Sequence, residues 1–227
     1  MNAMVAIRGN DADYDRWSGQ GASGWDASSV RDAFRRLESH RLGDTERHGG
    51  TGPVMVTAPA QPHQLSRAFV DAALACGLPA NTDFNGATQI GAGLYDVTIG
   101  DGQRSSAVTY LRAMGDRPNL TIITDAMVGR LIIDNGVVSG VEYSVGDEQL
   151  TAVGHETILS AGAFGSPQLL MLSGIGPADH LREIGIDVRV ASEQVGKNLQ
   201  DHPRIDIGFR TAAPIELSPT TNYLEAG

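Results

Sequence analysis

The chain has 227 residues, 41% of them hydrophobic, and a formal net charge of −10 at neutral pH. This length and apolar content allow a substantial core in one domain or slightly more. Its lysines and arginines are dispersed, so the chain lacks the basic stripe that nucleic acids or anionic membranes require, and we expect neither as a partner.

Cysteine and hydrophobicity patterns narrow the class further. Cys76 is the only cysteine, which excludes an internal disulfide, and its apolar helical surroundings predict a buried, inert side chain. No apolar run approaches the length of a membrane span, and residues 1–10 carry a charge where a signal peptide has its apolar centre. We therefore expect a cytoplasmic protein without a membrane span. Histidines and carboxylates show no ligand spacing, so we predict no metal site.

The N-terminal fifty residues predict one helix between polar loops. Residues 1–8 indicate a short buried segment, and Gly9 to Trp17 has the composition of a polar turn. Asp26 is a helix-capping residue, and apolar residues at helical spacing after it predict a helix to about Ser39.

The next part of the chain predicts a short strand and two helices. Val54 to Thr57 reads as the strand, and Leu65 to Cys76 follows a helical period with Gly77 as its stop. Ser105 or Ser106 caps a second helix. The whole region 40–102 is rich in loops, and we interpret it as a possible lid or substrate-side insertion.

One stretch of this region superficially resembles a dinucleotide-binding fingerprint. Gly91, Ala92 and Gly93 give its first half, but Asp96 stands where the third glycine should be. We reject the motif.

From Leu120 the composition changes to that of strands. Leu120 to Thr124 and Met127 to Ile133 are rich in β-branched and leucine residues, and Asn135-Gly136 predicts a tight hairpin turn. With a further strand over 150–153 this indicates a β-meander. His155 to Ser160 predicts a strand that returns to a parallel sheet.

Residues 158–176, with the sequence ILSAGAFGSPQLLMLSGIG, predict a strand, a turn and a helix. Ser166 and Pro167 suit the first positions of the helix, and Gly174 suits a left-handed stop. Small residues at such a corner let backbone N–H groups approach an anionic ligand. An ordinary strand-to-helix corner of an α/β protein explains the same residues.

Four segments, in this order, resemble the glucose-methanol-choline (GMC) family of FAD-dependent oxidoreductases, in the style of its choline and alcohol dehydrogenases. They are NAMVAIRG with DYD and Trp17, DGxRS with a later YL, GA with SP and SGIG, and VGKNLQDHP over 195–203. The resemblance implies an α/β fold with α+β elements. It would be an incomplete FAD-binding Rossmann-like domain over 1–203 with an inserted β-meander, and the start of a substrate-binding domain over 204–227.

The resemblance also implies the cofactor, FAD, and the residues that touch it. They are Asn2, Ala3, Met4 and Val5 near the flavin ring, Val128 on the adenine side, and Gly162 and Ala163 at the corner. Alone, Asn2 reads as a turn or cap residue and Val128 as an ordinary core valine. Asp201 and His202 are interpreted as structural.

The implied chemistry is oxidation of a CH–OH group of a small alcohol, choline or another primary alcohol, by hydride transfer to the flavin. The chain lacks the N-terminal GxGxxG unit, and none of its six histidines matches the family's catalytic histidine. We therefore name no catalytic residue and expect a fragment whose isolated form is inactive and binds FAD weakly or not at all. The alternative is a non-catalytic flavin-fold or assembly module, or an inactive truncated product. A hydrolase is disfavoured because no GxSxG motif is present.

Overall fold

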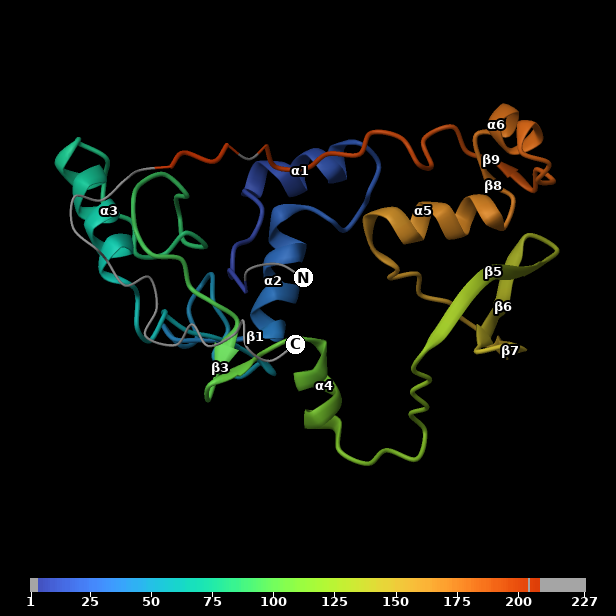
Figure 1. Ribbon diagram of the computed structural model, residues 1–227, viewed down its shortest axis with the longest axis horizontal. Helices are drawn as coiled ribbons and strands as arrows, with labels where there is room; N and C mark the ends of the chain where they lie inside the picture. Colours follow the sequence, from blue (N-terminus) through green and yellow to red (C-terminus); the bar gives the residue numbers. More distant parts are fainter. Residues whose placement is uncertain (1–3, 204, 209–227) are drawn as a thin grey trace. The chain divides into compact units, whose positions relative to one another are not determined.

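A computed structural model describes residues 4–203 and 205–208. The chain divides into two units, one running to Arg117 and the next beginning at Pro118. Figure 1 shows the helices and strands of each unit. Each unit is described by itself below.

Two capped helices open the first unit. Helix α1, Asp11–Gly19, begins at Asn10, whose side chain accepts the Ala12 N–H while the Asp13 carboxylate accepts the Asn10 N–H. This reciprocal cap stabilises a helix where a polar turn was predicted over Gly9 to Trp17, and that prediction is wrong. Helix α2, Ala27–Leu37, begins at Asp26 as predicted.

Short strands follow α2. Strand β1, Glu38–His40, pairs in parallel with β2, Val54–Val56, which confirms the predicted strand. Glu38 and His40 point to the buried side of β1, and Ser39 between them points the other way, as the two-residue period of a strand requires. Strands β3, Ile99–Gly100, and β4, Gln103–Arg104, form a small hairpin.

Two helices complete the first unit. Helix α3, Gln64–Ala75, and helix α4, Ala107–Met114, match the predicted positions, and Ser106 caps α4. Cys76 is exposed at the end of α3, because no residue of that helix is buried, so the prediction of a buried thiol is wrong.

The glycines of the rejected fingerprint have a local role. The Ala92 N–H donates to the Pro79 carbonyl and the Asn81 N–H to the Ala92 carbonyl, which lays this segment on residues 79–81. A Cβ added at Gly93 would collide with the Asn81 carbonyl oxygen. Glycine is required here by close approach of two backbones.

The second unit is built on the predicted β-meander. Strands β5, Ala126–Asp134, β6, Val137–Val145, and β7, Glu148–Val153, form an antiparallel sheet in the order β5-β6-β7. Asn135 and Gly136 connect β5 to β6 with φ of 51° and 81°, as a tight hairpin turn requires. Residues 120–124 and 155–160, all described, form no strand, so those two strand predictions are wrong.

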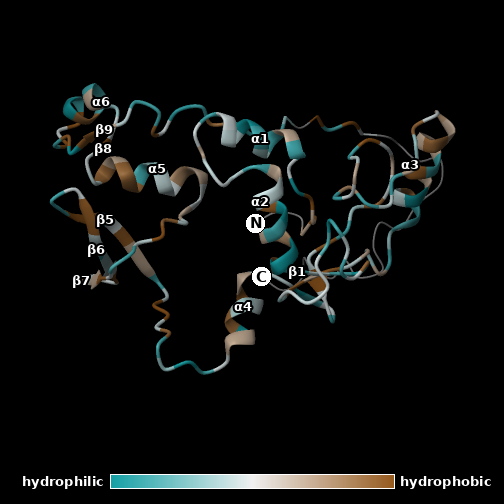
Figure 2. Ribbon diagram, turned by 180° about the vertical axis from the view of Figure 1, so that it is seen from behind, coloured by the Kyte–Doolittle hydropathy of each residue, from teal (hydrophilic) through white to brown (hydrophobic). Residues whose placement is uncertain are grey.

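Helix α5, Gly162–Leu172, packs against β5 and is hydrophobic along most of its length (Figure 2). It begins five residues earlier than predicted, so Ser166 is not its cap and Pro167 lies inside it. The Ser166 hydroxyl instead accepts the Ala161 N–H at 3.1 Å. The predicted stop is confirmed, since Gly174 follows the helix with φ of 85°.

The last elements are short. Strand β8, Ile175–Gly176, pairs in parallel with β9, Val190–Ala191, and helix α6, Ala178–Glu183, lies between them in sequence. Leu181 of α6 is fully buried. Residues 205–208 form no strand, and the rest of the predicted strand to residue 210 lies outside the described residues. Among the residues that the structure describes, no helix is long and apolar enough to cross a membrane.

Candidate functional site

Two of the predicted flavin contacts of the first unit, Met4 and Val5, lie on an extended segment, Met4 to Arg8. Asn2 and Ala3 lie outside the described residues. Met4 has a φ of 61°, and its carbonyl accepts the Thr98 N–H at 2.8 Å. Val5 forms an isolated antiparallel bridge with Val97 and is 37% exposed, so one side of this segment is open to a ligand.

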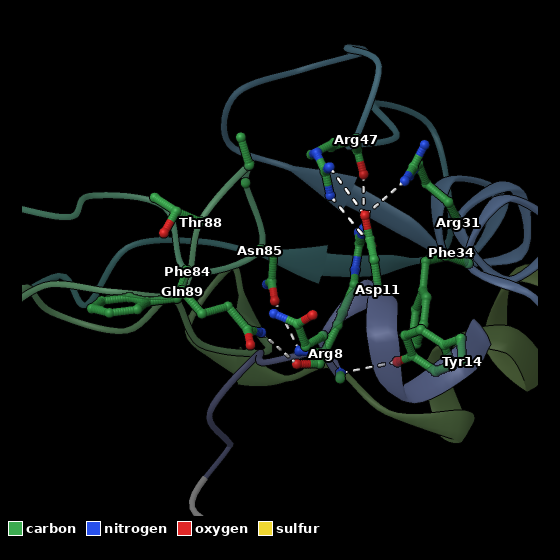
Figure 3. Close-up of a pocket in the computed structure, with 15 residues that line it drawn as sticks. Arg8, Asp11, Tyr14, Arg31, Phe34, Arg47, Phe84, Asn85, Thr88 and Gln89 are labelled. Carbon is green, nitrogen blue, oxygen red and sulfur yellow. Dashed lines mark hydrogen bonds and ion pairs between the residues drawn. The ribbon is translucent and has the colours of Figure 1, made fainter. Parts of the chain in front are cut away.

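The remainder of the segment is held by side chains of residues 85–89. The Asn85 side chain accepts the Arg8 N–H through Oδ1 at 2.8 Å and donates from Nδ2 to the Ala6 carbonyl at 2.8 Å. Gln89 donates to the Arg8 carbonyl at 2.9 Å. Figure 3 shows the Asn85 and Gln89 side chains directed toward Arg8. Asn85 thus replaces the neighbouring strand that this backbone would otherwise need.

A closed ring of five residues ties this segment to β1, and we call it the polar ring: Arg8, Glu38, His48, Asp83 and Asn85. The Arg8 guanidinium lies 2.5 Å from Glu38, and Glu38 Oε1 lies 2.9 Å from His48 Nδ1. His48 Nε2 lies 3.0 Å from an Asp83 oxygen, and the other Asp83 oxygen accepts the Asn85 N–H at 3.1 Å. The Arg8 N–H to Asn85 closes the ring.

His48 sits between two carboxylates and is only 2% exposed. Burial lowers the pKa of a histidine, but the hydrogen bonds to Glu38 and Asp83 outweigh it, so the pKa of His48 is raised. Burial would likewise raise the pKa of Glu38, and the hydrogen bonds from His48 and Arg8 reverse this, so that pKa is lowered. A protonated His48 can donate from both ring nitrogens.

A second histidine, His40, stacks on His48 with ring centroids 3.7 Å apart and 11° between the planes. Its Nδ1 accepts the Leu42 N–H, so Nε2 carries the proton and donates to Asp96 at 3.1 Å. Burial lowers the pKa of His40, and the charge on His48 lowers it further. Arg41 pairs with the other Asp96 oxygen at 2.8 Å.

The buried charges balance when His48 is protonated and His40 is neutral. Three carboxylates then face three cations, and buried ions are tolerated when they are paired in this way. The groups are Glu38, Asp83, Asp96, Arg8, Arg41 and His48.

His40, His48 and Asp83 also place ligand atoms within 4.8 Å of one another, as a metal site would. A metal lies in the plane of each imidazole, about 2.0–2.1 Å from the nitrogen. Two nearly parallel rings 3.7 Å apart point their lone pairs side by side rather than to a common point, and each ring nitrogen already has a hydrogen-bond partner. The cluster is therefore a hydrogen-bonded network, not a metal site.

A small pocket of about 90 Å³ adjoins the polar ring (Figure 3). Asp11 lies at its wall, 3.0 Å from Arg31 and 3.2 Å from Arg47. The volume suits a few water molecules or a small anion and is far below the several hundred Å³ of pockets that enclose a cofactor. Because Asp11 and Glu46 already pair with these two arginines, the pocket does not attract a further anion strongly.

The other predicted cofactor contacts lie in the second unit. Val128 is on β5, is 37% exposed and precedes an irregularity in the pairing of β5 with β6. Gly162 and Ala163 are exposed at the start of α5. Gly162 has a φ of 83°, and a Cβ there would meet nothing within 4 Å. None of these three residues takes part in the hydrogen bond between β5 and the end of α5, in which the Leu131 N–H donates to the Ser173 hydroxyl at 2.8 Å.

The start of α5 has the features of a backbone-binding site. Its N-cap, Ala161, has no side chain that can accept the first N–H groups of the helix, and an 11-residue helix concentrates positive potential there. Ala163 also lines a groove with residues from the predicted VGKNLQDHP segment. Its other lining residues are Phe164, Ser166, Pro167, Gln168, Leu170, Met171, Gln194, Val195, Gly196, Lys197 and Leu199. Small exposed residues and N–H groups without a side-chain cap leave this end of the helix accessible to a polar or anionic group.

Sequence reasoning missed the polar ring. Residues 40–102 were interpreted only as a loop-rich region. The available signal was composition: two histidines and several Asp and Asn residues occur in segments otherwise rich in glycine. No spacing rule connects His48 with Asp83 or Arg8 with Asn85, because these pairs meet only through the fold.

Comparison with known proteins gives the family context. The family model described as GMC oxidoreductase matches residues 1–204. The mitochondrial choline dehydrogenase of Mus musculus is 42% identical over 219 residues, which are 96% of this chain and 37% of that protein. Pyridoxine 4-oxidase from Mesorbium loti matches with a TM-score of 0.82 and 34% identity over 88% of this chain and 40% of that one.

An FAD-dependent oxidoreductase from Chaetomium thermophilum matches with a TM-score of 0.79 and 31% identity over 88% of this chain and 37% of that one. The chain thus spans 37–40% of the length of these relatives.

Proposed function

Because the chain belongs to the GMC oxidoreductase family, whose members are FAD-dependent flavoproteins, we propose that it forms part of an enzyme that oxidises a CH–OH group of a small alcohol. The observation that carries the proposal is the match of the family model over residues 1–204. Similarity to choline dehydrogenase favours choline or another primary alcohol as the substrate. A cytoplasmic location remains part of the proposal.

The proposed FAD contacts are those that the family resemblance implies. Asn2 to Val5 and Val128 contact it mainly through backbone groups, and Gly162 and Ala163 offer N–H groups of α5. The open side of Val5, the exposed backbone at Gly162 and the uncapped start of α5 support these assignments.

When bound, FAD would supply the redox step by accepting a hydride from the alcohol carbon. The residues of this chain would bind and orient it, and we assign none of them a catalytic role. The segment from Met4 to Arg8 is suited to this task, because hydrogen bonds at Met4, Ala6 and Arg8 hold its backbone in one conformation.

Titration of the purified chain with FAD, followed by flavin fluorescence, tests cofactor binding. We expect weak binding or none for the chain alone; a purified sample that carries stoichiometric flavin would contradict this expectation.

A chimera tests the catalytic proposal. This chain would replace the matching 37% of mouse choline dehydrogenase. We expect the chimera to retain flavin and to reduce a dye in the presence of an alcohol. A folded, flavin-loaded chimera that oxidises neither choline nor other alcohols would argue for the alternative, a non-catalytic flavin-fold or assembly module.

A further inference from the structure

We propose that the polar ring is a positioning device that fixes the segment from Met4 to Arg8 for the flavin, and that Asn85 is its principal positioning residue. The inference rests on the proposed function in one respect only, that this segment touches FAD. The claim that the ring fixes the segment stands on the geometry of the first unit alone.

The hydrogen bonds of the segment divide into two halves. At its start, backbone partners hold it: the Thr98 N–H donates to the Met4 carbonyl and the Ala6 N–H donates to the Asp96 carbonyl, each at 2.8 Å. From the Ala6 carbonyl onward no backbone partner takes over, and the Asn85 side chain bonds both the Ala6 carbonyl and the Arg8 N–H. The second half of the segment thus depends on side chains: Asn85 at the Ala6 carbonyl and the Arg8 N–H, and Gln89 at the Arg8 carbonyl.

Asparagine suits this position because its side-chain amide carries an acceptor oxygen and a donor nitrogen on the same carbon, as a peptide group does. Aspartate would keep the acceptor for Arg8 but would place a negative oxygen against the Ala6 carbonyl. Leucine has a similar size and offers neither group. Asn85 is 8% exposed, so water cannot readily replace a lost partner.

The closed polar ring fixes the position of Asn85. Its own N–H donates to Asp83, which His48 holds from the far side, and Glu38 connects His48 to the Arg8 guanidinium. Movement of the segment would therefore stretch several bonds at once. In such a network a single deletion affects every member.

Hydrogen exchange in the full chain tests the positioning. In Asn85→Leu we expect the Arg8 amide to exchange about five- to thirtyfold faster, the factor for one lost buried hydrogen bond. The exchange rate of the Arg41 amide, which donates to the Val56 carbonyl, should be unchanged. Asn85→Asp should leave the Arg8 amide protected. The control is Asn135→Asp, the same chemical change at the exposed hairpin turn, which should change neither amide. An Arg8 amide as protected in Asn85→Leu as in the wild type overturns the proposal.

FAD titration of the same four proteins tests the link to the cofactor. If the wild type binds FAD, we expect both Asn85 variants to weaken binding about tenfold, a loss of about 1.4 kcal/mol, at unchanged Arg41 protection. Equal affinity despite a deprotected segment would overturn the link. A wild type that does not bind FAD agrees with the expectation for the isolated chain, and the exchange result then decides the positioning claim by itself. If Asn85→Leu fails to fold, Asn85→Asp decides the positioning claim. Weaker FAD binding or faster amide exchange at Ala6 supports the claim, and wild-type values of both overturn it.

Discussion

The rings of His40 and His48 stack at 3.7 Å, yet their pKa values shift in opposite directions. The cause is what each ring contacts at its edges. His48 has a carboxylate at both nitrogens, whereas His40 has one carboxylate and one backbone N–H that requires an unprotonated Nδ1. The stack therefore holds one imidazolium and one neutral imidazole, since two stacked cations would repel each other.

These opposite shifts predict that the stability of the first unit passes through a maximum near pH 6.5, the usual histidine pKa. The raised pKa of His48 contributes stability that is complete below that value and is lost as pH rises through its folded-state pKa. The lowered pKa of His40 contributes stability above that value that is lost as pH falls. Thermal unfolding across pH measures both limbs.

Variants assign the two limbs to their residues. His48→Gln should flatten the alkaline limb and His40→Gln the acid limb, whereas His155→Gln at an exposed position should leave both. A monotonic profile in the wild type would contradict the prediction.

Glu38→Gln should destabilise the first unit by about 3 kcal/mol, because it removes the anion between two buried cations. The Arg8 side chain is 11% exposed and that of His48 2% exposed, so neither cation gains water in exchange. Urea unfolding measures the loss. The matched control is Asp44→Asn, which removes the exposed partner of Arg35 and should change stability little. Equal losses of unfolding free energy in the two variants would show that the buried ion pair at Glu38 stabilises the unit no more than an exposed one.

Ser173→Ala should destabilise the second unit by about 1–3 kcal/mol, the cost of leaving a buried N–H without an acceptor. The Ser173 hydroxyl accepts the Leu131 N–H and donates to the Leu169 carbonyl, and so joins α5 to β5. Ser160→Ala, at an exposed position, is the control. Circular dichroism during urea unfolding compares the two, and identical midpoints would refute the role of this hydroxyl.

Gly174→Ala should cost more than Gly185→Ala, although both glycines have similar positive φ, 85° and 75°. Each alanine incurs the strain of a left-handed backbone, about 1–2 kcal/mol. At Gly174 the new Cβ would also lie 2.5 Å from the Asp187 carbonyl oxygen, whereas at Gly185 it would meet nothing within 4 Å. Thermal unfolding of the two variants measures the difference, and equal losses would mean that the backbone near Asp187 moves aside without cost.

Local signals predicted the elements that depend on neighbouring residues. Asp26 and Ser106 cap their helices, Asn135 and Gly136 form the hairpin turn, and Gly174 stops α5, as the sequence indicated. The errors arose where the local signal was incomplete. A serine-proline pair suggested a later start for α5, and the reciprocal cap of α1 was overlooked.

The sequence predicted less well which side chains are buried and which segments pair as strands. Cys76 was expected inside and lies outside, since helical spacing tells which residues share a face but not whether anything covers that face. Residues 120–124 and 155–160 have strand composition without forming strands, because a strand exists only where a neighbour pairs with it.

The sequence by itself determined the family, through four motifs in order, and with it the expected cofactor. Only the tertiary structure revealed the polar ring, because its members Arg8, Glu38, His48, Asp83 and Asn85 lie up to 77 residues apart. A motif of a few neighbouring residues indicates where the backbone can approach a ligand. A buried network of charges depends instead on three-dimensional proximity and on exclusion of water, which chain order does not encode.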